Sequence, residues 1–425
     1  MSDIVIANGR TISGDNIDIK ISEGVIDSIE SAGTLSGTVD NEYNADERLV
    51  TPTFSEPHVH LDIGLTAGEP RWNQSGTLSE GISLWNEYKQ DLSAEDVRER
   101  AEQTLQWLAA NGVTRVRTHV DTTEETLTGL REILKLKKKY QEIISLEVVA
   151  FPQAGILSDP QHEDLLIEAI ELGADLIGGI PHFELTYQDG VESIELAMDL
   201  AEKHDCGVDM HIDEVDDEGS RFTEVLASES FKRDIGDRVT ASHATALHSY
   251  PNDYADKVIG MIADSGMNVI TNPLDNSVLQ GRYDEYPRRR GHTRIDELHE
   301  ANVTVGIGHD SIMDPVYHYG TADPLDAAYV LIHYAHMNGY TDVGTIWEML
   351  TKANASILGA ESYGLEPGAE GSVLVFDGKT PFDVLRTRAA RTAVINDGRI
   401  VAKTDPAQTT LSGPTGEESV TFTPK

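Results

Sequence analysis

Cysteine is nearly absent from this chain of 425 residues. Cys206 is the single cysteine, so neither a disulfide nor a zinc cluster of thiolates can form within one chain. The residue precedes the strand-like run GVDMHID, and we expect it to fill a small space in the core.

Positive charge is also scarce. The chain has 33 Lys and Arg against 73 Asp and Glu, a formal net charge of -40, and only 13 of the cations are lysines. At molar salt the Debye length is about 3 Å, so such a surface is screened yet stays hydrated, which suits a high-salt cytoplasm. The acids are dispersed rather than grouped in an acidic tail. Their sign disfavours nucleic acid and anionic membranes as partners.

Long apolar runs are missing as well. None reaches the roughly 18 residues of a membrane span, and the first residues, MSDIVIANGR, lack the basic-then-apolar layout of a signal peptide. We therefore expect a soluble, cytoplasmic protein. With 39% hydrophobic residues, the chain can bury one large core and a smaller one.

Both ends of the chain read as short strands between turns. The first fifty residues include DIVIANGR, IDIKISEG and VIDSIE, and the last sixty include GSVLVFDG, TAVINDGR and IVAK. Alternating apolar residues around Asp-Gly turns are typical of antiparallel sheet. We expect residues 1–52 and 364–425 to form two parts of one small β-sandwich.

The middle of the chain alternates β and α patterns. Eight apolar runs end at PHVH, RTHV, VAFP, GGIP, HID, ASH, ITN and IGHD, and amphipathic segments such as AEDVRERAEQTLQWLAANG separate most of them. This predicts an α/β fold, a (β/α)8 TIM barrel over residues 53–363. A doubly wound open sheet is the alternative, but no G-x-G-x-x-G follows the first strand.

In a barrel of this kind, functional residues gather at the carboxyl ends of the strands. His58 and His60 end the first run, and residues two apart on a strand can face one ion together. Taken alone, this pair equally fits a hydrogen-bonded strand end. Polar residues ending three other runs should meet the pair at the rim: His211, Asp213 and Glu214; Ser242 and His243; His309 and Asp310.

Three nitrogens and one oxygen make a ligand set typical of zinc or iron, with positions left open for water. The candidate ligands are His58, His60, His211 and Asp310. A divalent ion lowers the pKa of a bound water, and Glu214 is near enough to carry protons. His243 is placed to orient that water, so the constellation favours a hydrolase.

Three further strand ends carry polar side chains. Gln153 follows the third run, where its amide can both donate to and accept from a neutral amide-bearing ring, although a turn residue after Pro152 fits as well. His119 and His182 end the second and fourth runs. Each histidine is expected to be structural.

The segments PHVHLD, PRWNQSGTLSEGI, VRTHVD, AFPQAGIL, HIDEVDDE, ASHATALHSY, NPLDNSVLQGRYDEYPRRRG and GHDSIMDP together resemble the cytosine deaminases of the amidohydrolase superfamily. The similarity runs from about residue 45 to 360. It implies a distorted barrel with a β-sandwich from both termini, a small-molecule substrate and, often, a homo-oligomer.

The resemblance also implies roles for the candidate residues. One Fe(II) or Zn(II) would lie on the four ligands, Glu214 would protonate a ring nitrogen, and His243 would position the attacking water. Asp310 would relay a proton, and Gln153 would hold the substrate's carbonyl and adjacent NH. Leu78, Ser311 and Val316 would contact the substrate. The implied reaction converts cytosine to uracil and ammonia.

Two positions depart from the family pattern. Ser311 stands where close relatives have a second aspartate after the ligand Asp310, and Val316 stands where they have tryptophan. Both residues are smaller, which should leave more room beside the reacting carbon. A 5-substituted cytosine, isocytosine, creatinine or an amino-triazine therefore remains an alternative substrate.

Two other functions are less favoured. Ring-opening barrels of the dihydroorotase kind commonly bridge two ions with a carboxylated lysine, but no lysine lies between Lys139 and Lys203, so we expect one metal ion. A scaffold that has lost its activity would be expected to have lost ligands, and all of them are present.

Overall fold

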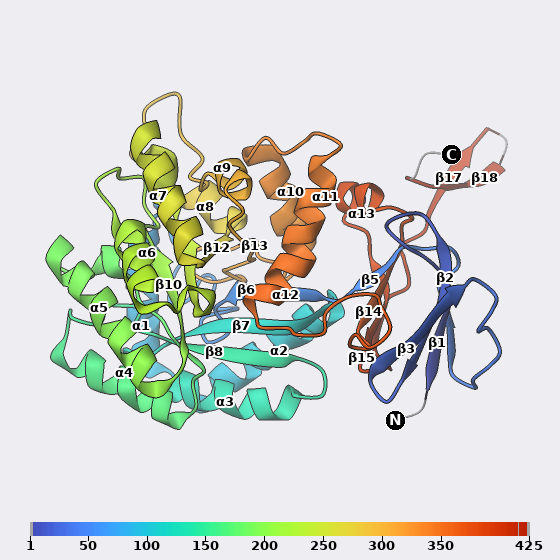
Figure 1. Ribbon diagram of the computed structural model, residues 1–425, viewed down its shortest axis with the longest axis horizontal. Helices are drawn as coiled ribbons and strands as arrows, with labels where there is room; N and C mark the ends of the chain where they lie inside the picture. Colours follow the sequence, from blue (N-terminus) through green and yellow to red (C-terminus); the bar gives the residue numbers. More distant parts are fainter. Residues whose placement is uncertain (1–2, 415, 423–425) are drawn as a thin grey trace.

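The computed structural model describes residues 3–414 and 416–422. Residues 1–2, 415 and 423–425, which belong to the expected terminal parts, lie outside the described residues. Figure 1 shows a large α/β body on one side and small β-sheets on the other, with both ends of the chain on the side of the small sheets.

Eight parallel strands form the large sheet, as the eight apolar runs predicted. In sheet order they are β13 (Val305–Ile307), β12 (Asn268–Thr271), β11 (Val239–His243), β10 (Gly207–Ile212), β9 (Leu176–Ile177), β8 (Ser145–Phe151), β7 (Val113–Asp121) and β6 (Phe54–Val59). A parallel bridge between Val59 and Asp310 joins the first strand to the segment after the last. This contact closes the barrel, so the open-sheet alternative is wrong.

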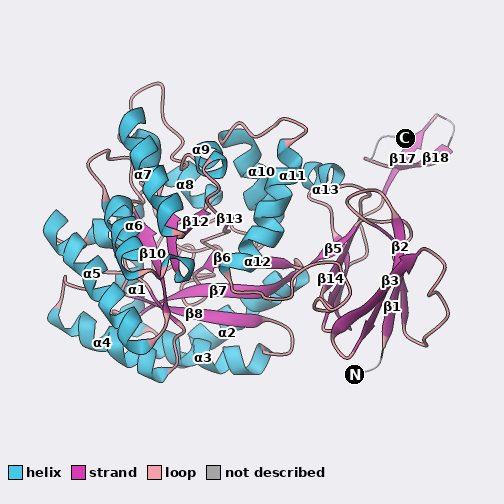
Figure 2. Cartoon of the chain, in the orientation of Figure 1, coloured by secondary structure: helices cyan, strands magenta, loops and turns pink. Residues whose placement is uncertain are grey.

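Helices surround these strands, as the cyan ribbons of Figure 2 show. They are α1 (Leu78–Tyr88), α2 (Ala94–Ala110), α3 (Thr128–Tyr140), α4 (Pro160–Leu172), α5 (Tyr187–His204), α6 (Phe222–Arg233), α7 (Asn252–Ser265), α8 (Pro273–Leu279), α9 (Ile295–Glu300), α10 (Pro324–Tyr334), α11 (Asp342–Glu348), α12 (Asn354–Ile357) and α13 (Pro381–Thr387). No helix among the described residues is long and apolar enough to cross a membrane.

Local sequence signals explain where these helices begin and end. Helix α4 begins after Asp159, whose carboxylate accepts a hydrogen bond from the Gln161 backbone N–H, and Pro160 occupies the first helical position. It ends at Gly173, whose φ of 116° is open only to glycine at low cost. These two caps therefore set the limits of α4.

Two small sheets contain strands from both ends of the chain. The first has the order β3 (Val25–Ser31), β2 (Asn16–Ser22), β1 (Ile4–Arg10), β4 (Glu42–Asn44), and the second β16 (Arg399–Lys403), β15 (Arg391–Asn396), β14 (Val373–Phe376), β5 (Val50–Pro52). Ile4, Ile21, Val373 and Ile395 belong to one buried cluster between them. The terminal segments thus form a sandwich with its own core. A separate hairpin, β17 (Thr409–Gly413) with β18 (Gly416–Val420), follows.

Aromatic side chains join the sandwich to the barrel. The ring of Phe54, on the first barrel strand, lies 5.8 Å from that of Phe376 on β14 and 5.9 Å from that of Trp347. All three side chains are buried. Because Phe54 opens β6, which contains His58 and leads directly into His60, this contact anchors the strand that positions both histidines.

Candidate metal centre and active site

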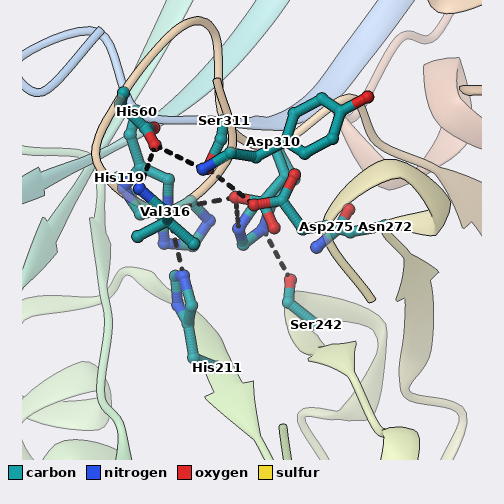
Figure 3. A network of polar contacts seen from close by, with 12 residues as sticks. His60, His119, His211, Ser242, Asn272, Asp275, Asp310, Ser311 and Val316 are labelled. Carbon is teal, nitrogen blue, oxygen red and sulfur yellow. Dashed lines mark hydrogen bonds and ion pairs between the residues drawn. The ribbon is translucent and has the colours of Figure 1, made fainter. Parts of the chain in front are cut away.

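The barrel brings the four predicted ligands together at its carboxyl end. His58 lies near the end of β6 and His60 follows that strand, His211 lies on β10, and Asp310 follows β13. His60 Nε2 is 3.1 Å from His211 Nε2, and Asp310 Oδ1 is 3.6 Å from His58 Nε2 and 3.4 Å from His60 Nε2. Figure 3 shows the side chains of His60, His211 and Asp310 converging. All four are buried.

Unusual backbone conformations turn two of these strand ends toward the mouth. Asp310 has a φ of 68° and His243 a φ of 73°, values that cost a residue with a Cβ roughly 1 kcal/mol or more. The Asp310 N–H donates to the His58 carbonyl at 2.8 Å. The fold thus holds both side chains in orientations that ordinary strand geometry would not provide.

A buried chain of hydrogen bonds orients His58. Ser242 Oγ donates to Asp209 at 2.7 Å and lies 3.0 Å from His58 Nδ1. Since the hydroxyl proton goes to Asp209, the serine oxygen accepts from Nδ1–H, and His58 Nε2 keeps its lone pair. Arg117 donates to the other carboxylate oxygen of Asp209 at 3.0 Å. This second layer fixes the ring with Nε2 toward the cluster, as metal-binding histidines require.

Burial sets the protonation of the cluster. It lowers the pKa values of His58, His211 and His243 well below their usual range and lowers that of His60 as well. These imidazoles are therefore neutral, with lone pairs available. Burial, with Asp314 nearby, raises the pKa of Asp310. A cation between these groups would reverse that shift.

The side chains present fit a divalent ion. His58 Nε2 is buried without a hydrogen-bond partner. The Nε2 atoms of His60 and His211 face each other at a distance where at most one proton can lie between them. His58, His60 and Asp310 form one group with mutually close ligand atoms, and His58, His211 and His243 form another. The four predicted ligands together offer three nitrogens and one oxygen, a set suited to zinc or iron.

His243 and Glu214 stand beside this cluster. His243 Nδ1 is 3.0 Å from Asn276 Nδ2 and 3.5 Å from Glu214 Oε1, and its Nε2 is 3.8 Å from Asp310 Oδ2. Burial, followed by the nearby Asp310 and Asp275, raises the pKa of Glu214 well above its usual value. A carboxyl that retains its proton more readily than usual is suited to proton transfer at neutral pH.

A small pocket opens onto the cluster, and we call it the inner pocket. Its lining residues are His60, Ile63, Leu78, Gln153, Ile180, His211, Glu214, Asp275, Asp310, Ser311, Asp314 and Val316. All the residues predicted to contact a substrate are therefore in its wall. Gln153 Oε1 is buried there without a partner. Leu78 and Glu214 also line a larger outer cavity of about 540 Å³, which gives the inner pocket its approach from solvent.

Other residues that end strands lie outside the inner pocket. Asp213 accepts from the backbone N–H groups of Phe222 and Thr223, so it caps α6 instead of facing the site. His309 Nε2 accepts from the Thr321 N–H at 3.3 Å, on the side away from the ligands as strand alternation requires. His182 lines the outer cavity.

His119 lies closer to the cluster than a purely structural residue would. Its ring centroid is 4.1 Å from that of His58, and both ring nitrogens are buried without a partner. With His58 and Asp209 it forms a further group of close donor atoms. Asp209, however, is already paired with Arg117, which opposes a second cation there.

Two buried acids of the inner pocket escaped prediction from sequence. Asp275 lies in the first turn of α8, and Asp314 lies beyond Ser311 in the loop after β13. Neither ends an apolar run, so the signal that found the other residues was absent. Cys206 is free and packs partly buried against the main core.

Comparison with known proteins places this site in a family. The model of the amidohydrolase family matches residues 86–402. A crystal structure of 5-methylcytosine deaminase from Klebsiella pneumoniae, liganded with 5-fluorocytosine, is 40% identical; the match covers 95% of this chain and 98% of that one, with a TM-score of 0.92.

More distant relatives act on other nitrogen-containing compounds. N-isopropylammelide isopropyl amidohydrolase of Pseudomonas sp. (strain ADP) is 28% identical over 94% of this chain and 97% of its own length. Pterin deaminase of Rhizobium rhizogenes (strain K84) is 27% identical over 92% and 88%. The barrel, the buried cluster of histidines and acids at its mouth, and these matches together show that the chain belongs to the amidohydrolase family and is a hydrolase of C–N bonds.

Proposed function

We propose that this protein hydrolytically deaminates a cytosine ring that carries a substituent at carbon 5. The observation that carries the proposal is the composition of the inner pocket, where a cluster suited to a metal, a buried acid and a neutral amide share one wall. Cytosine itself is the parent substrate, and a 5-methyl or 5-fluoro group is the extension that the pocket favours.

The ionisable side chains of the inner pocket favour a neutral substrate that carries several hydrogen-bond donors. Its ionisable lining residues are histidines and carboxyls, and none of the lining residues that the structure describes is a lysine or arginine. A substrate carboxylate, as in ring-opening hydrolysis of dihydroorotate, would find no cationic side chain among these lining residues to pair with. An uncharged amino-heterocycle fits this environment.

A metal would be held by His58, His60, His211 and Asp310. When bound, the ion makes a water acidic enough to act as nucleophile at neutral pH. His243, fixed by Asn276, would hold that water toward the ring, and Asp310 Oδ2 would take up its proton. We expect a single ion, because Arg117 is paired with Asp209 in the neighbouring group.

Two side chains would hold the ring itself. The unpartnered Gln153 Oε1 is free to accept from a ring N–H while its amide N–H donates to the adjacent carbonyl. Glu214 would deliver a proton to the next ring nitrogen, and so neutralise charge that develops as the amine-bearing carbon becomes tetrahedral. Asp310 would return the water proton to the amine, the hydroxyl proton on the tetrahedral carbon would pass to Glu214, and ammonia would leave the oxo ring.

The preference for a 5-substituent rests on two small residues. Ser311 and Val316 stand where the cytosine deaminases that the sequence resembles have larger side chains, and both line the inner pocket. The solved relative that is 40% identical carries the name 5-methylcytosine deaminase. Apolar contact with one buried methyl group contributes about 0.8 kcal/mol, enough to bias selectivity severalfold.

A second candidate substrate class is the amino-triazines. The relative named N-isopropylammelide isopropyl amidohydrolase, which aligns over 94% of this chain, favours it. Loss of ammonia from an amino-triazine would use the same attack and the same proton transfers.

An ammonia-release assay tests the proposal. Purified protein, loaded with zinc or with iron in high salt, is given cytosine, 5-methylcytosine, 5-fluorocytosine, isocytosine, creatinine and an amino-triazine. The expected result is the highest kcat/KM with a 5-substituted cytosine. Release from the triazine alone would favour the second candidate, and no release from any ring would overturn both.

A further inference from the structure

Asp275 is a buried carboxyl of the inner pocket with no part in the reaction described so far. Helix α8 begins directly after β12, and this puts Asp275 in the first helical turn, at the barrel mouth. Its side chain is 1% exposed and lines the pocket with Asp310 and Glu214. Figure 3 shows it beside Asp310, with Ser311 near both.

One oxygen of this carboxyl is satisfied and the other is not. Ser311 Oγ donates to Asp275 Oδ2 at 2.6 Å. Asp275 Oδ1 is buried and has no hydrogen-bond partner among the described residues. A buried acceptor without a donor costs about 1–3 kcal/mol, so Asp275 Oδ1 is suited to a donor brought by the substrate. Ser311 orients the carboxyl for it.

The order of side chains around the barrel identifies that donor. Gln153 follows β8, Glu214 follows β10 and Asp275 follows β12, so they are spaced two strands apart in an eight-stranded barrel. Gln153 and Asp275 therefore lie on opposite sides of the mouth, with Glu214 between them. The ring of cytosine has the same order: N1–H and the C2 carbonyl, then N3, then the amine on C4.

We propose that Asp275 Oδ1 accepts a hydrogen bond from the exocyclic amine of the substrate, with Ser311 holding the carboxyl in place. The inference rests on the proposed function and adds a recognition element to it. The unpartnered Asp275 Oδ1 selects an amino ring over the oxo product, because an amine can donate to this oxygen whereas a carbonyl oxygen in the same position cannot. Product release is favoured by the same contact.

The test measures binding of substrate and product in the absence of turnover. In the zinc-loaded Glu214→Gln background, calorimetry gives the Kd of 5-methylcytosine and of its product thymine, with and without Asp275→Val. We expect the added change to raise the Kd of 5-methylcytosine at least tenfold, which is about 1.4 kcal/mol. The Kd of thymine should stay unchanged or fall. A ratio of the two Kd values that does not move, or an equal weakening of both ligands, would overturn the inference.

Two further measurements separate the possible failures. If Asp275→Val does not fold, the isosteric Asp275→Asn carries the test. The amide should raise the Kd of 5-methylcytosine severalfold and leave the Kd of thymine unchanged. An unchanged ratio of the two Kd values overturns the inference. Turnover by the unmodified protein is measured alongside. Ammonia release with an unmoved ratio rejects the role of Asp275 alone, whereas the absence of release from any ring rejects the proposed function.

Discussion

His60 Nε2 and His211 Nε2 lie 3.1 Å apart although 151 residues separate them in the sequence. Burial lowers the pKa of both rings, so two neutral imidazoles point nitrogen atoms at the same small volume. Asp310 Oδ1 and His58 Nε2 border that volume. Such an arrangement of nitrogen and oxygen donors is suited to a divalent cation.

Replacing His60 by alanine should abolish metal retention. We expect zinc content, measured by inductively coupled plasma mass spectrometry after dialysis, to fall from about one ion per chain to near zero, because one of only four ligands is lost. His119→Asn is the control, since His119 belongs to the competing group with Asp209. Zinc lost from His119→Asn and kept by His60→Ala would place the ion in the other group.

Replacing Ser242 by alanine should weaken metal binding without removing a ligand. The change deletes the oxygen that accepts from His58 Nδ1, and loss of such a contact typically costs 10–100-fold in metal affinity. Competition against a zinc-binding dye measures it. Ser230→Ala, which removes another buried hydroxyl that donates within α6, should leave the affinity unchanged. Equal effects in the two variants would argue against the orienting role of Ser242.

Replacing Glu214 by glutamine should keep the metal and lose turnover. The amide has the shape of the acid but cannot deliver a proton, and general acid–base groups typically contribute 10²–10⁴-fold. Zinc analysis and steady-state ammonia release on the same sample check both halves of the expectation. Full activity in Glu214→Gln would show that the proton comes from another group.

Replacing Val316 by tryptophan should reverse the preference for a 5-substituent. The larger ring would fill the inner pocket beside Ser311, so kcat/KM for 5-methylcytosine should fall by at least tenfold relative to that for cytosine. Val278→Trp, at a partly exposed position on α8, is the matched control and should leave the ratio alone. An unchanged ratio in Val316→Trp would mean that carbon 5 faces elsewhere.

The fold was predictable because its signals are local and repeated. Eight apolar runs separated by amphipathic segments correspond to β6 through β13, and Asp-Gly turns marked β15 and β16 at the end of the chain. Closure of the barrel was not visible locally. It depends on the contact of Val59 with Asp310, between residues far apart in the sequence.

The site was predictable only where a polar residue interrupts an apolar run. That rule found His58 and Asp310, yet it also selected Asp213, which turned out to cap α6. It missed Asp275, because β12 is followed by an asparagine and a proline, and the acid comes only in the first turn of α8. The sequence gives the position of a polar side chain but not the direction in which it points. Asp310 and Asp275 point into the inner pocket, whereas Asp213 points toward α6.

Water labelled with ¹⁸O gives the most direct test of the central claim. The zinc-loaded protein is incubated with 5-methylcytosine in H₂¹⁸O, and the products are identified by mass spectrometry. Hydrolytic deamination predicts ammonia together with thymine that carries ¹⁸O at carbon 4 of an intact ring. A ring-opened product, or thymine without the label, would contradict the account.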